Sequence, residues 1–303
     1  MTIEQWAKEL AEITNPENIK INEPLKKYTM TKIGGNADIL VMPETEEEVE
    51  AIVKYAHHNQ LPLLVLGNGS NMIVRDGGVR GIVMNLSKLN EIRIDGTDVY
   101  AQSGALIMDV SKKAAEASLT GLEFACGIPG SVGGAMAMNA GAYGGEIKDI
   151  IVHSTVLTRE GERLVLSKEE LELGYRKSII ADRNYIVLSS LFHLEKGDKK
   201  EIDEKIADLT FKRQSKQPLE YPSAGSVFKR PPGYFAGKLI QDSGLQGKGV
   251  GDAEVSTKHA GFIINKGNAT ARDYIETIKM VQRTVKEKFG VDLELEVKIV
   301  GED

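Results

Sequence analysis

The 303-residue sequence contains a single cysteine, Cys126, so an intramolecular disulfide is excluded. So little cysteine suits a reducing compartment, and we expect the protein in the cytoplasm. Cys126 borders a glycine-rich stretch, where a catalytic thiol has to be considered, but no neighbouring residue is an obvious base for it. We interpret Cys126 as a small packed hydrophobe.

Histidine, basic charge and long apolar runs are also scarce. The five histidines do not follow the spacing of metal ligands, so no metal site is predicted. A formal net charge of −6 implies no broad basic surface, and we predict no nucleic-acid partner. No apolar run reaches the length of a membrane span, and the acidic, amphipathic N-terminus lacks the basic start of a signal peptide. We therefore predict no membrane association, and no obligate protein partner is evident.

Glycine, in contrast, is concentrated in one stretch, residues 127–146, which reads GIPGSVGGAMAMNAGAYGGE. Seven of its twenty residues are glycine, and its only charged residue is Glu146. A flexible linker would be polar, so the apolar residues between the glycines argue against simple flexibility. Such a loop can pack its backbone against a flat ligand and bind pyrophosphate through free N–H groups. A tightly packed turn in a buried sheet is the alternative, and composition does not separate the two.

A second glycine loop follows a short apolar run. Residues 62–66 (PLLVL) predict a buried strand, which leads into GNGSN at 67–71. The loop lacks the lysine of a P-loop, and it lacks the third glycine that opens a helix in the Rossmann fingerprint. It therefore indicates a phosphate-binding loop of the dinucleotide type without the Rossmann topology.

Periodicity elsewhere predicts mixed α+β layers rather than a regular βαβ repeat. Ser167 and Glu170 form a capping-box pattern, which predicts a short helix. Alternating apolar and polar residues over 291–299 predict a strand with Glu294 and Glu296 on its polar face. The longer elements expected from the pattern are helices at 2–13, 45–58, 106–118, 199–216 and 270–289, and a hairpin at 151–167.

Taken together, the two glycine motifs resemble the FAD-binding domain of the vanillyl-alcohol-oxidase (PCMH) type. GNGSN followed by the NAGAYG core is similar to one family with that domain, the UDP-N-acetylenolpyruvoylglucosamine reductases of peptidoglycan synthesis. The similarity continues through GYRKS at 174–178, AGSVFK at 224–229 and LELEV at 293–297. After GYRKS the chain reaches its next strand quickly, by Tyr185, which is typical of the shorter form of the family that lacks an inserted tyrosine loop.

The resemblance implies an α+β fold, with a PCMH-type FAD-binding domain followed by a C-terminal α+β substrate-binding domain. A short charged segment at 196–200 is the expected boundary. The last strand, at about 291–300, is expected to return to the active site. The expected ranges are 1–197 for the FAD-binding region, with lobes at about 1–66 and 67–197, and 198–303 for the substrate-binding domain.

The resemblance also implies a reaction, the NADPH-dependent reduction of UDP-N-acetylglucosamine enolpyruvate to UDP-N-acetylmuramate. FAD is expected to be bound noncovalently and to pass hydride from NADPH to the substrate in ping-pong order. The alternative among enzymes is a PCMH-type flavin oxidase that acts on a sugar or hydroxy acid. The alternative outside enzymes is a catalytically silent flavin- or UDP-sugar-binding module. The sequence leaves open the choice between NADPH and NADH, the oligomeric state and any monovalent-cation requirement.

The resemblance assigns three catalytic residues. Arg176 of GYRKS matches the arginine that holds the substrate carboxylate, a role suited to a planar bidentate cation. Ser226 of AGSVFK matches the proton donor, and Glu296 of LELEV matches the catalytic glutamate, which acts either as an acid or as an orienting group. Without the resemblance, these residues would be interpreted as a surface arginine, a turn serine and a solvated strand residue.

Binding residues are assigned through the same motifs. Tyr143 matches a residue at the substrate, and Lys216 matches a basic residue near its diphosphate. Arg213 lies at the same basic helix end and is also expected to bind substrate. The alternative is that these basic residues are solvated and only favour the negative end of the helix dipole. Arg230 stands where longer members carry asparagine, so the way the uridine diphosphate end is held is left open. The residues expected to bind FAD are Gly67, Asn68, Gly69, Ser70, Asn71, Gly127, Ile128, Pro129, Gly130, Ser131, Gly133, Gly134, Asn139 and Gly141.

Overall fold

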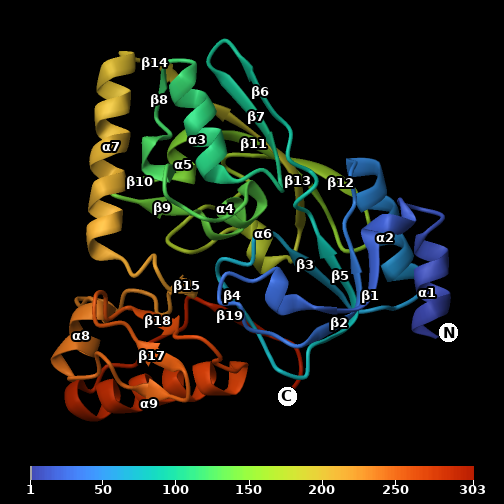
Figure 1. The fold of residues 1–303 in the computed structure, drawn as a ribbon. Helices are drawn as coiled ribbons and strands as arrows, with labels where there is room; N and C mark the ends of the chain where they lie inside the picture. The colour runs from blue at the N-terminus through green and yellow to red at the C-terminus, as the bar shows by residue number, and fades with distance from the viewer. Residues whose placement is uncertain (1) are drawn as a thin grey trace. The chain divides into compact units, whose positions relative to one another are not determined.

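A computed structural model of the chain describes residues 2–303 (Figure 1). The helices over these residues are α1 (Ile3–Leu10), α2 (Glu46–His58), α3 (Ile107–Glu116), α4 (Val132–Met138), α5 (Ile147–Ile150), α6 (Ile179–Asp182), α7 (Lys199–Lys216), α8 (Ala236–Asp242) and α9 (Ala271–Phe289). Short 3-10 turns are η1 (Pro16–Asn18), η2 (Leu25–Lys27) and η3 (Glu123–Ala125).

The strands form two four-stranded sheets, ordered β1-β2-β5-β3 and β15-β18-β17-β16, and a five-stranded sheet, ordered β12-β11-β13-β7-β6. Pairs β10-β9, β14-β8 and β19-β4 complete the pairing. The strands are β1 (Ile19–Pro24), β2 (Asn36–Val41), β3 (Leu63–Leu66), β4 (Met72–Val74), β5 (Val79–Asn85), β6 (Ile92–Asp95), β7 (Asp98–Gln102), β8 (Leu119–Thr120), β9 (Gly141–Ala142), β10 (Gly145–Glu146), β11 (Ile151–Leu157), β12 (Arg163–Ser167), β13 (Ile186–His193), β14 (Glu195–Lys196), β15 (Ser223–Ser226), β16 (Gly249–Val250), β17 (Ala253–Val255), β18 (Phe262–Asn265) and β19 (Lys298–Val300).

The chain forms two compact units, each built from separate segments of sequence. The first unit contains the described residues up to Ile21 together with Ile39–Asn68 and Gly81–Arg213. The second contains Asn22–Asp38, Gly69–Arg80 and Gln214–Asp303. Most of α7 thus belongs to the first unit. The functional division expected after residue 197 stays a prediction, since compactness and function need not divide a chain at the same residue.

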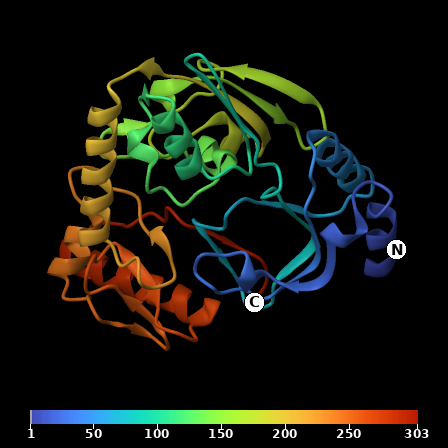
Figure 2. The ribbon, with the colours of Figure 1, turned by 45° about the horizontal axis from the view of Figure 1, so that its top comes forward.

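One core of the first unit lies between two helices and a sheet. Thr45 caps α2 by accepting a hydrogen bond from the Glu48 N–H at 3.1 Å. The buried stripe of α2, which includes Ile52, packs with Leu10 of α1 and Ile82 of β5 in one apolar cluster. Figure 2 shows α1 and α2 as the two blue helices that lie side by side. This core anchors β3, the strand that ends at the first glycine loop.

The other core of the first unit lies under the five-stranded sheet. Val99 of β7 and Phe192 of β13 are fully buried there with Val110 of α3 and Met136 of α4. Helix α4 packs directly against β7 and β13. The sheet therefore supports the second glycine motif, because α4 lies within that motif.

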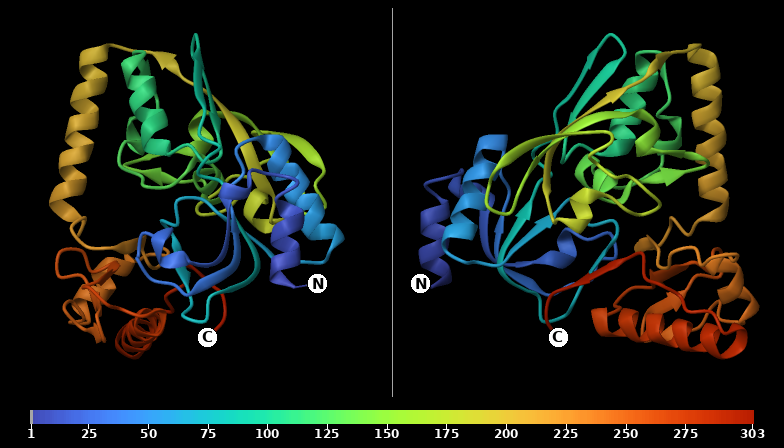
Figure 3. Two further views of the ribbon diagram at one scale, coloured as in Figure 1. Left: turned by 45° about the vertical axis from the view of Figure 1, so that its right-hand side comes forward. Right: turned by 180° about the vertical axis from the view of Figure 1, so that it is seen from behind.

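The second unit is built around α9 and the sheet β15-β18-β17-β16 (Figure 3). Thr270 caps α9 in a reciprocal capping box, and Gly290 ends the helix with a φ of 70°. Tyr274 is fully buried and donates its hydroxyl hydrogen to the Ile263 carbonyl at 2.6 Å. Asp76, from far earlier in the sequence, accepts hydrogen bonds from the first N–H groups of α9, which places a negative charge at its positive end.

Most expected elements are present, and two differ. Ser167 and Glu170 exchange the hydrogen bonds of a capping box, yet the segment forms turns. Because Glu172 has a φ of 47° only two residues later, no helix can propagate there. The segment after α9 alternates in burial as predicted only up to Glu294, because Glu296 is half-buried, and only Lys298–Val300 forms a strand, in parallel with β4. Across residues 2–303, no helix combines the length and apolarity that crossing a bilayer requires.

Candidate active site

The two glycine motifs meet in the first unit. The side-chain amide of Asn68 donates a hydrogen bond to the Pro129 carbonyl at 2.6 Å. A Cβ at Gly67 would collide with the Ser131 hydroxyl, so glycine is required where the loops approach. The Asn85 amide holds the Gly67 carbonyl at 3.2 Å. The sequence predicted both loops, and the structure places them in contact.

The second motif contains a helix that the sequence reasoning missed. Ser131 caps α4 by accepting a hydrogen bond from the Gly134 N–H at 3.4 Å, and Ala135–Met138 are good helix formers. The serine before an alanine- and methionine-rich run was the signal for this helix. A Cβ at Gly133 would lie 3.1 Å from the Ser103 Cβ, so close packing of α4 on the sheet explains this glycine.

The residues present fit a flavin with a pyrophosphate. Among the described residues, the backbone N–H groups of Asn68, Gly130 and Ser131 donate to no group of the protein, so they are available to phosphate oxygens. The Ser103 hydroxyl is buried and has no hydrogen-bond partner within residues 2–303. A buried hydroxyl without a partner is costly, so Ser103 is a further candidate that no sequence motif had indicated.

The second half of GNGSN belongs to the second unit. Gly69 has a φ of 59° and its carbonyl accepts from the Met30 N–H at 3.1 Å. The Asn71 side-chain amide donates to the Glu296 carbonyl at 3.0 Å, and the Asn71 carbonyl accepts from the Lys298 N–H at 3.0 Å. The residues expected to bind FAD here, Gly69, Ser70 and Asn71, therefore adjoin the segment that bears the predicted catalytic glutamate.

Tyr143 and Arg213 lie close together in the first unit. Arg213 has no ion-pair or hydrogen-bond partner over the described part of the chain. Its stem packs on Gly127, where a Cβ would lie 2.6 Å from the Arg213 Cδ. Burial lowers the pKa of Arg213, and Tyr143 and Cys126 are near enough to oppose the shift. A half-buried cation beside a tyrosine suits an anionic ligand.

Arg176 stands at the third position of a tight turn in the first unit. Gly174 and Lys177 exchange backbone hydrogen bonds of 3.0 and 3.1 Å across this turn. Arg176 and Tyr143 both have a φ of 54°. This is the left-handed region of the backbone, which residues other than glycine, asparagine and aspartate rarely enter. Backbone strain at two predicted site residues is a feature that often accompanies function.

Ser226 and Glu296 are brought together in the second unit. Gly225, with a φ of 73°, lies at a register shift between β15 and β18, and Ser226 follows it. The Glu296 N–H donates to the Val227 carbonyl at 2.8 Å, next to Ser226. Glu296 is half-buried, whereas the Glu294 side chain is 77% exposed. Lys216 is exposed at the end of α7. The roles of these residues stay predictions.

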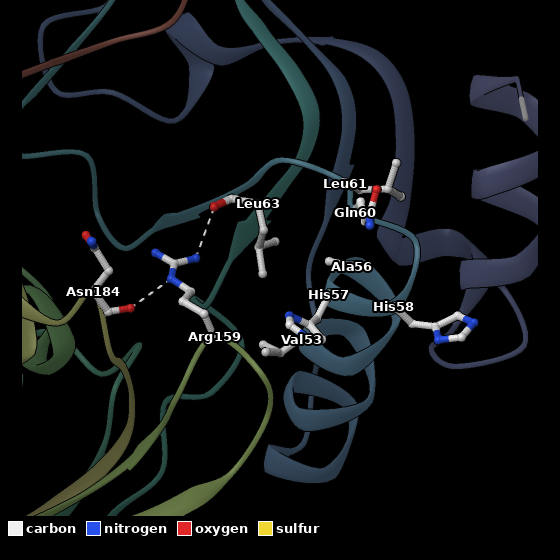
Figure 4. A pocket seen from close by; sticks show the side chains of 9 residues that line it. All are labelled: Val53, Ala56, His57, His58, Gln60, Leu61, Leu63, Arg159 and Asn184. Carbon is white, nitrogen blue, oxygen red and sulfur yellow. Dashed lines mark hydrogen bonds between the residues drawn. The ribbon is translucent and has the colours of Figure 1, made fainter.

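A cavity of about 700 Å³ in the first unit is lined by none of the predicted site residues (Figure 4). His57 and His58 line it at the end of α2, opposite Arg159. Arg159 donates to the Asn184 carbonyl at 2.8 Å and to the Leu63 carbonyl at 3.0 Å, and burial lowers its pKa. We interpret Arg159 as a structural residue that links the turn after β11 to β3 and to the turn before β13. Across residues 2–303, no cluster of three or more His, Cys, Asp or Glu could hold a metal ion.

Comparison with known proteins identifies both parts of the chain. The model of a family described as "FAD binding domain" matches residues 37–167. A second model, described as "UDP-N-acetylenolpyruvoylglucosamine reductase, C-terminal domain", matches residues 217–300.

Curated relatives are similar over nearly the whole chain. A UDP-N-acetylenolpyruvoylglucosamine reductase of Geobacillus kaustophilus is 64% identical over 99% of this chain and 99% of its own length. One of Listeria innocua is 61% identical over 94% of this chain and 96% of its own length.

Solved structures agree with this result. The crystal structure of the UDP-N-acetylenolpyruvylglucosamine reductase from Thermus caldophilus superimposes with a TM-score of 0.80 at 37% identity, over 93% of this chain and 98% of that one. A glucose dehydrogenase structure matches with a TM-score of 0.52 at 14% identity, over 64% of this chain and 44% of that one, which is a likeness of fold alone. The fold class predicted from the resemblance is confirmed.

Proposed function

The chain belongs to the family of UDP-N-acetylenolpyruvoylglucosamine reductases, and we propose which of its residues carry out that family's reaction. The reaction is the NADPH-dependent reduction of UDP-N-acetylglucosamine enolpyruvate to UDP-N-acetylmuramate in peptidoglycan precursor synthesis. The two glycine loops would hold FAD, which would supply the hydride chemistry between NADPH and the substrate. The observation that supports the proposal most strongly is the direct contact between the two loops at Asn68 and Pro129.

The substrate's chemistry defines what the protein must provide. The carbon–carbon double bond is conjugated to a carboxylate, and hydride arrives at the methylene carbon. Negative charge then accumulates on the carboxylate until a proton reaches the carbon that bears the ether oxygen. The protein therefore has to place a cation at the carboxylate and a proton donor at that carbon.

Arg176 is our candidate for the carboxylate. Its guanidinium offers parallel N–H donors that match both carboxylate oxygens, and its charge persists at every physiological pH. The turn from Gly174 to Lys177 presents it in a strained conformation with a φ of 54°. Strain of this kind costs about 1–3 kcal/mol and persists only where the surroundings impose it.

Ser226 is our candidate for the proton donor, and Glu296 for the group that assists at the carboxylate. The backbone of Ser226 pairs with Phe262 of β18, but its hydroxyl makes no hydrogen bond within residues 2–303, so the hydroxyl is available to a ligand. Glu296 is half-buried on the neighbouring segment and its backbone is fixed by Asn71 and Val227. A fixed backbone keeps a side chain within the narrow range of positions that proton transfer and orientation require.

Arg213, Tyr143 and Lys216 are our candidates for the diphosphate and the sugar. Arg213 has no described partner although it is half-buried, which favours an anionic ligand at that position. Tyr143 is 49% exposed although it is a large aromatic residue. We further propose that the reaction takes place in the cytoplasm, where NADPH and nucleotide sugars occur, and without a partner protein.

The experiment that tests the proposal separates the two half-reactions by stopped-flow absorbance. Arg176→Lys keeps the charge but loses the planar fork, so it should slow reoxidation of the reduced flavin by the enolpyruvyl substrate while NADPH reduces the flavin normally. Glu296→Gln should show the same selectivity. Glu294→Gln, on the same face but exposed, is the matched control and should behave as the wild type. A normal reoxidation rate in Glu296→Gln would show that the assignment is wrong.

A further inference from the structure

Asn139, at the end of α4, occupies a position where three segments of the site region come together. It is 1% exposed and has a left-handed backbone, with φ 44° and ψ 58°. Asn139 was predicted to bind FAD, which stays a prediction for its backbone rather than its side chain. In the structure, the amide already makes three hydrogen bonds within the protein.

One of these bonds reaches the turn that carries Arg176. The Asn139 Nδ2 donates to the Gly174 carbonyl at 3.0 Å, the same oxygen that closes the turn by accepting from the Lys177 N–H. On the far side of the turn, the Ser178 hydroxyl donates to the Ala137 carbonyl of α4 at 2.7 Å. The end of α4 therefore holds the arginine turn at both of its bases.

The other two bonds reach the hairpin that carries Tyr143 and the first turn of α5, which follows it. The Asn139 Nδ2 also donates to the Glu146 Oε2 at 2.6 Å, and its Oδ1 accepts from the Lys148 N–H at 2.9 Å. Glu146 pairs with Gly141 at the base of the β9-β10 hairpin, whose tip contains Tyr143. One buried amide thus ties the base of this hairpin to the base of the arginine turn.

We propose that Asn139 is a positioning residue for reduction of the enolpyruvyl group, because it holds the Arg176 turn in place through the Gly174 carbonyl. The inference rests on the proposed role of Arg176. Both tips carry strained residues with a φ of 54°, and such conformations need a rigid surrounding structure to persist. Asparagine is suited to the position, since it tolerates the left-handed region and has both N–H donors and a carbonyl acceptor.

The same helix serves two sites. Its N-cap Ser131 and first turn lie at the loops that we assign to FAD, and its C-cap Asn139 fixes the arginine turn. A displacement of about 1 Å in a reacting group costs on the order of 10²-fold in rate. Removing the Asn139 side chain should therefore slow the substrate half-reaction by about that factor.

The first test uses Asn139→Gly, which keeps the left-handed backbone accessible and removes all three side-chain bonds. We expect FAD content and the rate of flavin reduction by NADPH to stay within about threefold of wild type, with reoxidation by the enolpyruvyl substrate about 10²-fold slower. The control is Asn184→Gly, which removes another left-handed asparagine, with φ 54°, whose side chain makes no hydrogen bond within residues 2–303. Equal slowing of both half-reactions, or loss of FAD, would overturn the proposal.

A second readout does not depend on turnover. Equilibrium binding of the enolpyruvyl substrate should weaken in Asn139→Gly relative to binding of UDP-N-acetylglucosamine, which lacks the carboxylate. The double variant Asn139→Gly/Arg176→Ala should be no slower than Arg176→Ala alone, because the asparagine acts through the arginine. Independent, multiplying effects would contradict the proposal. If Arg176→Ala itself reoxidises normally, the role of Arg176 is wrong, and this result is distinguishable from a failure of the inference about Asn139.

Asn139→Asp covers the case in which the glycine variant does not fold. It keeps the size and the acceptor for the Lys148 N–H, but it loses the N–H donors and faces the Glu146 carboxylate. A protonated carboxyl can donate a hydrogen bond again, so reoxidation should recover relative to wild type as the pH falls. A pH profile parallel to that of the wild type would overturn the proposal.

Discussion

Valine substitutions at two adjacent glycines of α4, Gly133 and Gly134, should have different effects on folding stability. A Cβ at Gly133 would lie 3.1 Å from the Ser103 Cβ and 3.3 Å from the Ser103 carbonyl oxygen, so Gly133→Val forces α4 away from the sheet. Overpacking of this kind costs about 1–3 kcal/mol. A Cβ at Gly134 would meet only the Ser131 hydroxyl, at 3.6 Å, among the described residues. Gly134→Val should therefore leave the free energy of unfolding of the apoprotein nearly unchanged.

The flavin distinguishes the two variants further. Gly134 is exposed and its N–H lies on the first turn of α4, at the loops that we assign to the cofactor. We expect Gly134→Val to purify folded but with at least about tenfold less FAD than wild type, equivalent to a loss of roughly 1.4 kcal/mol or more in binding. Urea denaturation of the apoproteins and flavin absorbance after acid precipitation measure the two effects. A Gly134→Val protein that retains full FAD, or a Gly133→Val protein as stable as wild type, would refute the reasoning.

Three further predictions concern single residues. Arg213→Met removes a half-buried cation without a described partner, so the unfolding free energy should hold or rise while KM for the enolpyruvyl substrate rises about 10- to 100-fold. An unchanged KM with lowered stability would contradict this. Burial would raise the pKa of Glu123, but hydrogen bonds from Thr120, the Gly121 N–H and Lys205 outweigh it and hold that pKa below its ordinary value of 4.5. Glu123→Gln should therefore lower the unfolding free energy by about 1–2 kcal/mol at pH 7, and the difference should shrink below about pH 4.5, as urea denaturation at both pH values can measure. Ser226→Ala should bind and reduce flavin normally while reoxidation slows about 10²–10⁴-fold, and equal slowing of both half-reactions in stopped-flow would make Ser226 structural.

Features encoded locally could be predicted from the sequence. Thr270 and its capping box begin α9 where the pattern places it, since capping depends only on residues within one turn. The two glycine loops were identified from composition and spacing, because few residues other than glycine let a backbone approach a neighbouring group so closely. Helix α4 was missed because glycine has a low helix propensity, and only packing against β7 and β13 offsets it.

Features that depend on distant pairing could not be predicted. Asn71 contacts Glu296 across 225 positions of sequence, and strand periodicity alone placed Glu296 and Glu294 on the same solvated face. The strained backbones of Tyr143 and Arg176 leave no trace in a pattern of residue types, since both residues normally avoid a positive φ. The positioning role of the buried Asn139 amide likewise could not be predicted, because it depends on Gly174 and on other partners brought together only by the fold.

The central claim is that this chain carries hydride from NADPH through FAD to an enolpyruvyl UDP sugar. An anaerobic spectral titration of the purified protein tests it directly. The visible absorbance of the oxidised flavin should bleach with one equivalent of NADPH and return when UDP-N-acetylglucosamine enolpyruvate is added without oxygen. Flavin that recovers only on admission of oxygen, or that NADPH does not bleach, would contradict the account.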